Sequence, residues 1–273
     1  MRRVAARAEP LVAEPTPAEP TPREALRMTG GGTSSRGGTS RERDTAREWG
    51  TCTVVVPTHD EERLIGDTLE SLAAAAAHAG IAVRLIVVAD SCTDDTEAIA
   101  ARHGAEVVTV AALSVGAARR AGFIHALRTR PRPDWCATTD ADTVVPLDWF
   151  VRQEAHRLRG ADVVSGTITL RADDEPHRSH GAWRTQYEQR LGVASHTHVH
   201  GANLSFTASA YRMLDGFRTL ASGEDADLVR RAEDAGLSVV WALDVRVETS
   251  ARLTGRAPAG VAADLRAALE VVP

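Results

Sequence analysis

Lysine is absent from the sequence, whose 273 residues include 32 arginines. This absence excludes mechanisms that need a lysine side chain, such as a Schiff base or the phosphate contact of a P-loop. Aromatic residues contribute only 4% against 43% for apolar residues, so the core must consist mainly of valine, leucine, isoleucine and alanine. The net charge of −5 leaves no basic excess of the kind that binds nucleic acids, and no nucleic-acid partner is expected.

Cysteine and long apolar runs are scarce as well. Cys52, Cys92 and Cys136 are odd in number and lack CxxC spacing, which predicts buried, reduced thiols. No stretch approaches the ~18–20 consecutive apolar residues of a membrane span, and the first residues lack the apolar segment of a secretory signal. We therefore expect a cytoplasmic protein with no transmembrane segment.

Composition divides the chain into three regions. Residues 1–48 are rich in proline, glutamate and threonine and then in glycine, serine and arginine, without apolar periodicity. Such a segment cannot bury enough apolar surface to offset the entropy lost on ordering, so we expect a disordered N-terminal tail. One domain is expected over residues 49–255, and residues 256–273 are expected to form a C-terminal tail with an amphipathic helix.

Strand and helix patterns alternate regularly after the N-terminal tail. The expected segments, beginning and ending with a strand, are 51–57, 61–80, 82–90, 93–104, 105–110, 114–128 and 135–142. This order is typical of an α/β fold in which helices cover both faces of a mostly parallel sheet. Right-handed crossovers place the carboxyl ends of the parallel strands at one edge of the sheet, and ligands bind along that edge.

Carboxylates gather where these strands end. Glu61 follows the first strand, Asp90 ends the second, and Asp140 and Asp142 end the fourth. Two aspartates separated by one residue can approach the same divalent cation, and Mg²⁺ prefers oxygen ligands that it shares with phosphates and water. Alone, such a pair is equally compatible with a solvated turn. The strand before it and Asp90 at the same edge favour a metal site for a phosphate-bearing ligand.

A second acidic cluster, SGEDADL at residues 222–228, contains Glu224 and Asp225. Acidic residues in the first turn of a helix are stabilised by the helix dipole, which is a sufficient structural explanation. A carboxylate fixed at a helix start also suits a general base, because its rotamer is restricted. The two interpretations are compatible, and both are kept.

Three alternating histidines, His196, His198 and His200, precede the sequence GANLSF. In an extended chain their side chains leave the same face, as the ligands of a zinc site can. A zinc hydrolase is the weaker interpretation, because no HExxH motif and no second histidine cluster with metal-ligand spacing accompany them.

Six ordered motifs together resemble those of family 2 glycosyltransferases. They are VVVPTHDEERL from residue 54, VVADSCTDDT from residue 87, SVGAAR from residue 114, TTDADTVVP from residue 138, HGANLSF from residue 200 and GEDADLVRR from residue 223. A further segment, VETSAR at residues 247–252, resembles one found in some bacterial members. The similarity covers about residues 51–255, and six motifs in the family's order are far more specific than any one of them.

The resemblance implies a GT-A fold, a Rossmann-like α/β architecture with a mostly parallel sheet flanked by helices and a smaller acceptor-side region. Its nucleotide-binding half would span residues 49–142 and its acceptor half residues 143–255. The implied reaction is transfer of a sugar from a nucleotide-sugar donor, with a UDP-sugar favoured, to a hydroxyl of a small or lipid-linked acceptor. Transfer would proceed with inversion at the anomeric carbon and with the assistance of Mg²⁺ or Mn²⁺.

The resemblance also implies roles for individual residues. Asp225 is expected to be the catalytic base, and Asp142 the main metal ligand with Asp140 beside it. His200 is expected near the diphosphate as a hydrogen-bonding or third metal-shell residue. Arg252 and Arg256 follow the last strand, and from this position alone, rather than from the resemblance, they are expected to fold over the diphosphate. The residues expected to contact the nucleotide-sugar are Pro57, Thr58, His59, Glu61, Asp90, Gly116, Arg119, Asp140, Gly201, Asn203 and Glu224.

The second motif departs from the family pattern, since Ala89, Ser91 and Cys92 replace the usual aspartate, glycine and serine. The nucleotide preference is therefore less defined than the use of a metal. Two other classes stay open, a sugar-nucleotide-forming nucleotidyltransferase and a non-catalytic nucleotide-sugar-binding homologue. The first normally carries a glycine-rich loop and an essential lysine, and the second would be expected to lack Asp142 or Asp225. A homodimer formed through the C-terminal residues also stays open.

Overall fold

The computed structural model of the protein describes residues 51–171, 178–193, 195–255 and 260–270. These residues belong to a single unit, Arg47–Pro273. The predicted N-terminal tail, residues 1–48, lies outside the described residues, and so do residues 256–259 and 271–273 of the predicted C-terminal region.

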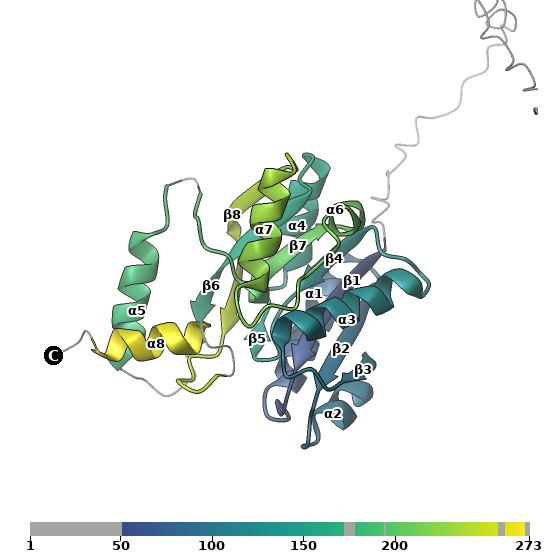
Figure 1. The fold of residues 1–273 in the computed structure, drawn as a ribbon, viewed down its shortest axis with the longest axis horizontal. Helices are drawn as coiled ribbons and strands as arrows, with labels where there is room; N and C mark the ends of the chain where they lie inside the picture. The colour runs from purple at the N-terminus through teal and green to yellow at the C-terminus, as the bar shows by residue number, and fades with distance from the viewer. Residues whose placement is uncertain (1–50, 172–177, 194, 256–259, 271–273) are drawn as a thin grey trace, which may run out of the picture. The chain divides into compact units, whose positions relative to one another are not determined.

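An eight-stranded sheet runs through this unit in the order β3-β2-β1-β4-β7-β6-β8-β5 (Figure 1). Its strands are β1 (Cys52–Thr58), β2 (Val83–Asp90), β3 (Glu106–Val110), β4 (Trp135–Thr138), β5 (Thr143–Val144), β6 (Val163–Leu170), β7 (Leu204–Thr207) and β8 (Val239–Thr249). β1 pairs in parallel with β2 and β4, β2 with β3, and β6 with β8, whereas β7 is antiparallel to both of its neighbours and β5 to β8. The predicted mostly parallel sheet is confirmed.

The fourth strand is shorter than predicted. It ends at Thr138, four residues before the expected end at residue 142. The N–H of Thr143 donates to the carbonyl oxygen of Asp140 at 3.2 Å, so the polar segment turns out of the sheet. It then enters β5, which pairs with β8 rather than with β4.

Helices cover both faces of the sheet. They are α1 (Ile65–Ala79), α2 (Thr96–Arg102), α3 (Val115–Arg128), α4 (Trp149–Leu158), α5 (Arg178–Gln189), α6 (Ala208–Met213), α7 (Glu224–Asp234) and α8 (Val261–Glu270), with a 3-10 turn at Gly201–Asn203. One core cluster contains Val54 and Val56 of β1 together with buried residues of α1, α2, α4, α5 and α8. The second contains Val55 of β1 together with buried residues of α3, α6 and α7. Successive side chains of a strand point to opposite faces, which explains this division. None of the helices described here combines the length and apolarity needed to cross a bilayer.

Local signals fix where several of these helices begin and end. α1 ends at Gly80 as predicted, with a φ of 66° in the left-handed region that glycine adopts without strain. α3 begins after Ser114, whose side chain accepts a hydrogen bond from the N–H of Ala117. Buried aromatic residues lie on both faces of the sheet. On the face covered by α3, ring centroids lie 4.9 to 6.1 Å apart among Phe123, Phe206, Tyr211 and Phe217.

The cysteines follow the prediction in two of three positions. Cys52 and Cys136 are buried and reduced, and burial raises the pKa of Cys52 to about 12. Cys92 is only half-buried, so the prediction of three buried thiols is wrong for this residue. It follows β2 at the edge of the sheet, where the chain leaves the core.

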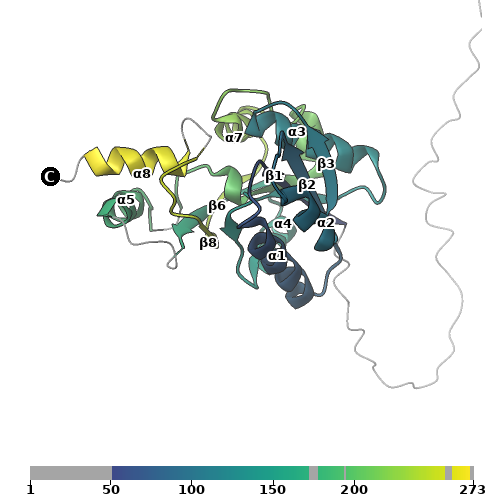
Figure 2. The same cartoon turned by 90° about the horizontal axis from the view of Figure 1, so that it is seen from below.

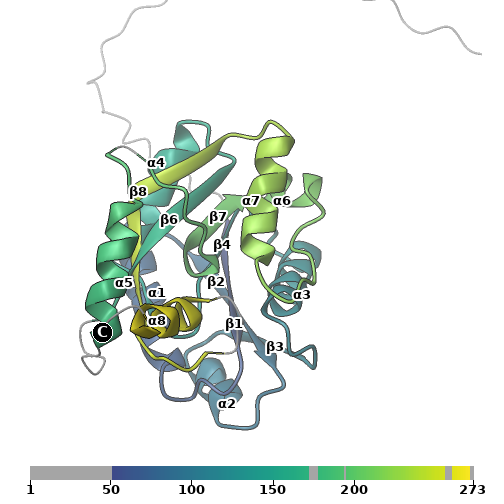
Figure 3. The ribbon, with the colours of Figure 1, turned by 60° about the vertical axis from the view of Figure 1, so that its left-hand side comes forward.

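α5 and α8 pack against each other beside β6 and β8 (Figures 1 and 2). Leu265 and Ala268 of α8 are buried in the same cluster as Trp183 and Tyr187 of α5. Figure 3 shows this pair from its own side of the molecule, with α8 in front of the sheet. The helix predicted for the C-terminal region is therefore present as α8, and it covers part of the core.

Candidate active site

The carboxyl ends of β1, β2, β4 and β8 meet at one edge of the sheet. β7 is antiparallel to β4 and to β6, so β6 and its parallel partner β8 run in the same direction as the first strands. The residues that follow these strands become neighbours: Glu61 after β1, Asp90 at the end of β2, Asp140 and Asp142 after β4, and Arg252 after β8.

Asp142 lies in a nearly buried group of charges with Glu61 and Arg252. Arg252 Nη2 is 3.1 Å from Asp142 Oδ2, and Arg252 Nη1 is 2.8 Å from Glu61 Oε2. Burial raises the pKa of Asp142 to about 6; Arg252 opposes this rise, while Asp140 and Glu61 add to it. Burial is the main cause of the raised pKa, and the carboxylate oxygens of Asp142 are of the type that a hard divalent cation prefers. The donor set at the end of β4 fits the predicted metal site.

Arg119 is the centre of a second charge network and is only 3% exposed. Its guanidinium forms ion pairs with Asp140, at 2.5 Å, and with Glu224, and it donates to Thr138 Oγ1 at 3.3 Å. Burial opposes the charge of Arg119, but the two carboxylates outweigh it and raise its pKa. Arg119 therefore ties the end of β4 to the start of α7. Its predicted contact with a donor is not supported by this arrangement, because the guanidinium is used inside the protein.

The backbone of Gly201 lies directly against the guanidinium of Arg119, which leaves no room for a side chain. A Cβ atom at Gly201 would lie 2.3 Å from Arg119 Cζ, so a larger residue would displace the arginine. The N–H of Gly201 donates to Asp225 Oδ2 at 2.7 Å, and the N–H of Ala226 donates to Asp225 Oδ1 at 2.8 Å. Both oxygens of Asp225 are thus held in place at the first turn of α7, as a general base requires.

Asp90 organises the loop between β3 and α3. Its carboxylate accepts the N–H groups of Ala112, Leu113 and Ser114 at 2.7 to 2.9 Å. Burial opposes the charged form, but these hydrogen bonds outweigh it and hold the pKa of Asp90 below its ordinary value. The carboxylate shapes the loop, and this geometry does not support its predicted contact with the nucleotide.

Gly116 and Asn203, two further residues expected at the donor, are also used inside the fold. The Asn203 amide donates to the carbonyl oxygens of Thr167 and Val245 at 2.8 and 2.9 Å and accepts from Trp149 Nε1 at 3.0 Å. A Cβ atom at Gly116 would lie 2.7 Å from a backbone carbonyl oxygen. Packing determines both positions, and neither geometry supports a direct donor contact.

Pro57, Thr58 and His59 occupy the end of β1, as predicted. Pro57 and Thr58 are buried in the strand, whereas His59 is half-buried. The Nδ1 atom of His59 lies 2.5 Å from the carbonyl oxygen of Asp90, so the ends of β1 and β2 are joined here. Contact of these three residues with a nucleotide stays a prediction.

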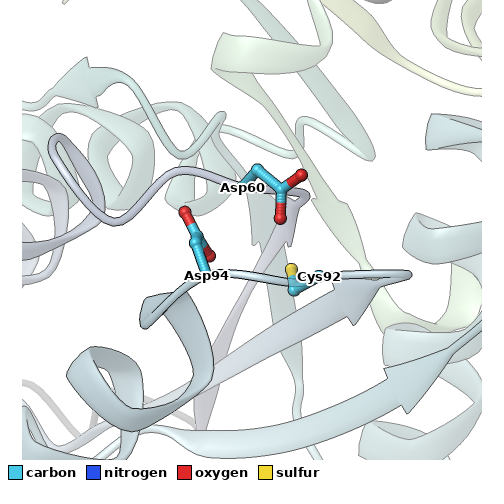
Figure 4. Close-up of side chains that lie close together, drawn as sticks. All are labelled: Asp60, Cys92 and Asp94. Atoms are coloured by element: carbon cyan, nitrogen blue, oxygen red, sulfur yellow. The ribbon is translucent and has the colours of Figure 1, made fainter.

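Asp60, Cys92 and Asp94 lie together where the loops after β1 and β2 meet (Figure 4). Their possible ligand atoms lie within 4.8 Å of one another, and no other such group of histidine, cysteine or acidic residues occurs in the described ranges. Asp60 accepts the N–H of Thr93 at 2.7 Å, and Asp94 accepts the N–H of Glu62 at 3.0 Å. These carboxylates cross-link the two loops, and we assign no metal to them.

The three histidines stack side by side. The ring centroids of His196 and His198 are 6.3 Å apart and those of His198 and His200 are 5.9 Å apart, as expected for alternate residues of an extended segment. His196 Nε2 lies 3.0 Å from the carbonyl oxygen of Ser165, and His200 Nε2 lies 3.0 Å from Tyr187 Oη. These two ring nitrogens are directed to separate partners, whereas the buried Nε2 atom of His198 has no hydrogen-bond partner in the described part of the chain. The three histidines do not bring their ligand atoms within 4.8 Å of one another in the described residues, so the zinc interpretation receives no support.

His200 does not join the carboxylates at the end of β4. Within the residues that the structure describes, neither His200 nor Glu61 forms a group with Asp140 and Asp142 in which all ligand atoms lie within 4.8 Å of one another. The ring is held instead by Tyr187, at the junction with α5. A role for His200 in the metal shell is therefore not supported by this arrangement.

His200 is expected to make the stability of the protein depend on pH. Burial, followed by the neighbouring His198 and His196, lowers the pKa of His200 from 6.5 to about 3. The unfolded chain takes up a proton as the pH falls through 6.5 while the folded chain does not, so the free energy of unfolding should fall below that pH and be unaffected above it. Urea unfolding between about pH 7 and about pH 5 should show a flatter fall for His200→Gln.

The exposed His78 of α1 provides the matched control for this pH dependence. His78→Gln should keep the wild-type slope of unfolding free energy against pH. If His200→Gln and wild type show the same slope, the buried neutral imidazole is not the cause.

An open groove of about 570 Å³ lies between β5, β8 and the start of α4. Its lining includes Val144, Asp148, Arg152, Asp244 and Arg246. None of the groove's lining residues belongs to the charge networks at the carboxyl edge of the sheet. We therefore do not include the groove in the candidate site.

An Asp-x-Asp pair follows β4 at the carboxyl edge of a mostly parallel sheet, and Asp225 is held nearby at the start of α7. This is the architecture of the GT-A glycosyltransferases. The model of the family described as "Glycosyl transferase family 2" matches residues 53–215, more than half of the 273 residues. The chain belongs to glycosyl transferase family 2, and the resemblance of its motifs is confirmed.

Curated relatives match part of the chain. The chain is 38% identical over 114 residues to an uncharacterized glycosyltransferase of Mycobacterium tuberculosis, and equally to one of Mycobacterium bovis. Each match covers 42% of this chain and 47% of the relative. The chain thus spans about half the length of the curated relatives it matches.

Solved structures share the fold at low sequence identity. The mannosyltransferase PcManGT of Pyrobaculum calidifontis has a TM-score of 0.61 at 20% identity, over 77% of this chain and 59% of its own. TarS of S. aureus has a TM-score of 0.56 at 16% identity, over 77% and 61%. The glucosyl-3-phosphoglycerate synthase of Mycobacterium tuberculosis has a TM-score of 0.51 at 21% identity, over 82% and 80%. These similarities confirm the predicted GT-A fold.

Proposed function

We propose that the chain is a glycosyltransferase that moves a sugar from a nucleotide-sugar donor to an acceptor hydroxyl, with a divalent cation held at Asp142. One observation carries this proposal: the Asp140–Asp142 pair after β4 is joined to Asp225 at the start of α7 through Arg119, Glu224 and Gly201. A metal–diphosphate site and a base are thereby held in one framework, as sugar transfer requires.

Complexes of the structural neighbours support the substrate class. PcManGT is in complex with GDP-Man and Mn²⁺, TarS with UDP-GlcNAc, and the glucosyl-3-phosphoglycerate synthase with Mn²⁺, UDP and phosphoglyceric acid. Uridine nucleotides occur in two of these three complexes, so a UDP-sugar is the donor we favour. The acceptor class is a small or lipid-linked molecule with a free hydroxyl.

The residues at the end of β4 would hold the cation. Asp142 and Asp140 offer carboxylate oxygens, and both Mg²⁺ and Mn²⁺ accept such ligands together with phosphate oxygens. When bound there, the cation would neutralise the charge that develops on the diphosphate leaving group. Glu61 lies on the other side of Arg252 and adds to the raised pKa of Asp142.

Asp225 would act on the acceptor. Its oxygens are oriented by the N–H groups of Gly201 and Ala226, and the remaining lone pairs are available to accept the proton of the attacking hydroxyl. A base placed opposite the leaving diphosphate gives attack from the far side of the sugar and inversion at the anomeric carbon. Glu224 does not take this role, because it is buried against Arg119.

A thermal-shift screen of UDP- and GDP-sugars tests the proposal. One of these donors should raise the melting temperature in the presence of Mn²⁺, because a ligand that binds only the folded state stabilises it. EDTA should remove the effect. A nucleotidyltransferase would instead respond to a nucleoside triphosphate or a sugar phosphate, and no response to any nucleotide-sugar would count against the proposal.

A further inference from the structure

Arg252 stands where a divalent cation is expected to bind. Its Nη2 atom is 3.1 Å from Asp142 Oδ2, and both of its Nη atoms contact the carboxylate of Glu61. Glu61 is 8% exposed and Asp142 is largely buried, so neither carboxylate can rely on water for compensation. Arg252 supplies that compensation to both.

Two arginines neutralise the carboxylates at this edge, and each is engaged with two of them. Arg119 is engaged with Asp140 and Glu224, and Arg252 alone bridges Asp142 and Glu61. A divalent cation bound directly to Asp142 would face the guanidinium at a contact distance, where two like charges repel strongly in a partly buried setting. The cation and Arg252 therefore compete for Asp142.

The backbone on either side of Arg252 is held by hydrogen bonds to two helices, so the side chain is the part that can exchange most easily. The carbonyl oxygen of Ala251 lies 3.0 Å from His180 Nε2 of α5, and that of Leu253 accepts from Arg266 Nη1 of α8 at 2.5 Å. The Arg252 side chain is 36% exposed, and a long, partly solvated side chain can change rotamer without moving the helices. Exchange at this position needs no rearrangement of the domain.

We propose that Arg252 is the resident counter-ion of Asp142 and that it must leave this carboxylate before a divalent cation binds. Arg252 then keeps its contact with Glu61 and is free to turn to the negative charges of the donor diphosphate. Cation binding is consequently weak in the absence of donor, and donor and cation bind cooperatively because each offsets the cost of displacing Arg252. Arg252 is a positioning residue, and the inference rests on the proposed function through the metal site at Asp142.

The affinity of the full chain for Mn²⁺ in the absence of nucleotide tests this inference. It is measured by calorimetry and by the electron paramagnetic resonance signal of free Mn²⁺. Arg252→Met removes the competing charge with little change in side-chain length, and Mn²⁺ affinity should rise at least about tenfold. Glu61→Gln leaves Arg252 with Asp142 as its remaining charged partner, and Mn²⁺ affinity should fall. Opposite changes from two neighbouring substitutions would not arise from a general loss of structure.

A second measurement follows the coupling between cation and donor. UDP and GDP are the probes, and their affinities are compared with and without Mn²⁺. Wild type should show strong coupling, and Arg252→Met should show weaker coupling and weaker diphosphate binding. Arg152→Met, at an arginine of α4 paired with Asp148, is the matched control and should leave both quantities unchanged.

Two outcomes overturn the inference in different ways. If Arg252→Met binds Mn²⁺ with wild-type or lower affinity, Arg252 is not a competing counter-ion, and the proposed function is unaffected. If neither wild type nor Arg252→Met binds Mn²⁺ at all, the metal site at Asp142 is contradicted, and the proposed function and the inference fall together.

Discussion

Replacing Asp225 by asparagine is expected to lower the rate of sugar transfer by about 10²–10⁴-fold, the usual contribution of a general base. The asparagine oxygen can still accept the N–H of Gly201, so the local geometry should persist while the ability to take a proton is lost. Affinity for the donor should stay within about twofold of wild type, because the base faces the acceptor. The rate is measured as release of the nucleoside diphosphate. Water serves as the acceptor in this assay until an acceptor has been identified.

Asp227 is the matched control for this substitution. It lies in the same helical turn, but its carboxylate is paired with Arg231, at 2.7 Å, and with Arg230, at 2.9 Å. Asp227→Asn should therefore lower stability without abolishing transfer below the melting temperature. Transfer at the wild-type rate by Asp225→Asn would show that another group is the base.

The second large effect is expected at Arg119. Arg119→Met leaves the Glu224 carboxylate, 4% exposed, without its charged partner. Breaking a buried ion pair in this way costs about 3–5 kcal/mol of unfolding free energy. The methionine also removes the group on which Gly201 rests and to which Asp140 is bound, so transfer should be lost even where the protein stays folded. Urea unfolding and the transfer assay measure the two effects separately.

Arg120 and Glu224 provide the controls for Arg119. Arg120→Met changes the next residue, which pairs with the exposed Asp215 and donates to the carbonyl oxygens of Asp215 and Phe217. Because no buried charge is left alone, this substitution should cost clearly less than Arg119→Met. Combining Arg119→Met with Glu224→Gln should recover part of the lost stability, because the buried charge is no longer left alone. Equal destabilisation by Arg119→Met and Arg120→Met would contradict a central structural role for Arg119.

The edge of the sheet could be predicted from the sequence, since local patterns define it. Apolar runs of strand length end at Asp90 and shortly before Asp140, and helices of 3.6-residue period lie between them. Parallel strands joined by right-handed crossovers have one possible arrangement of their carboxyl ends. The expected neighbourhood of Glu61, Asp140 and Asp142 is found in the structure for this reason.

The arginine partners of these carboxylates could not be predicted from the same patterns. Arg252 is 191 residues from Glu61, and Glu224 is 105 residues from Arg119. Their meeting depends on the path of the chain after β4, where β7 enters antiparallel and β8 returns in parallel to β6. No local period specifies that path.

Motif membership also did not reveal the structural contacts that the motif residues make inside the fold. Asn203 and Asp90 were expected at the donor, and a contact there stays a prediction. In the structure the Asn203 amide binds two backbone carbonyl oxygens and the indole N–H of Trp149, and the Asp90 carboxylate accepts three backbone N–H groups. The same amide or carboxylate can serve either purpose, and only the positions of neighbouring backbone groups decide between them. The histidines are a parallel case: their spacing correctly predicted side-by-side rings, but not that His196 contacts the carbonyl oxygen of Ser165 and His200 the hydroxyl of Tyr187.

Metal-dependent donor binding at Asp142 is the central claim, and calorimetric titration of the full chain with UDP- and GDP-sugars tests it most directly. Wild type is expected to bind one of these donors with Mn²⁺ and to lose that binding in EDTA. Asp142→Asn should bind the same donor at least about tenfold more weakly, whereas Asp148→Asn, at a carboxylate outside the site, should bind as wild type does. Donor binding of equal affinity without a cation, or unchanged affinity in Asp142→Asn, would contradict the claim.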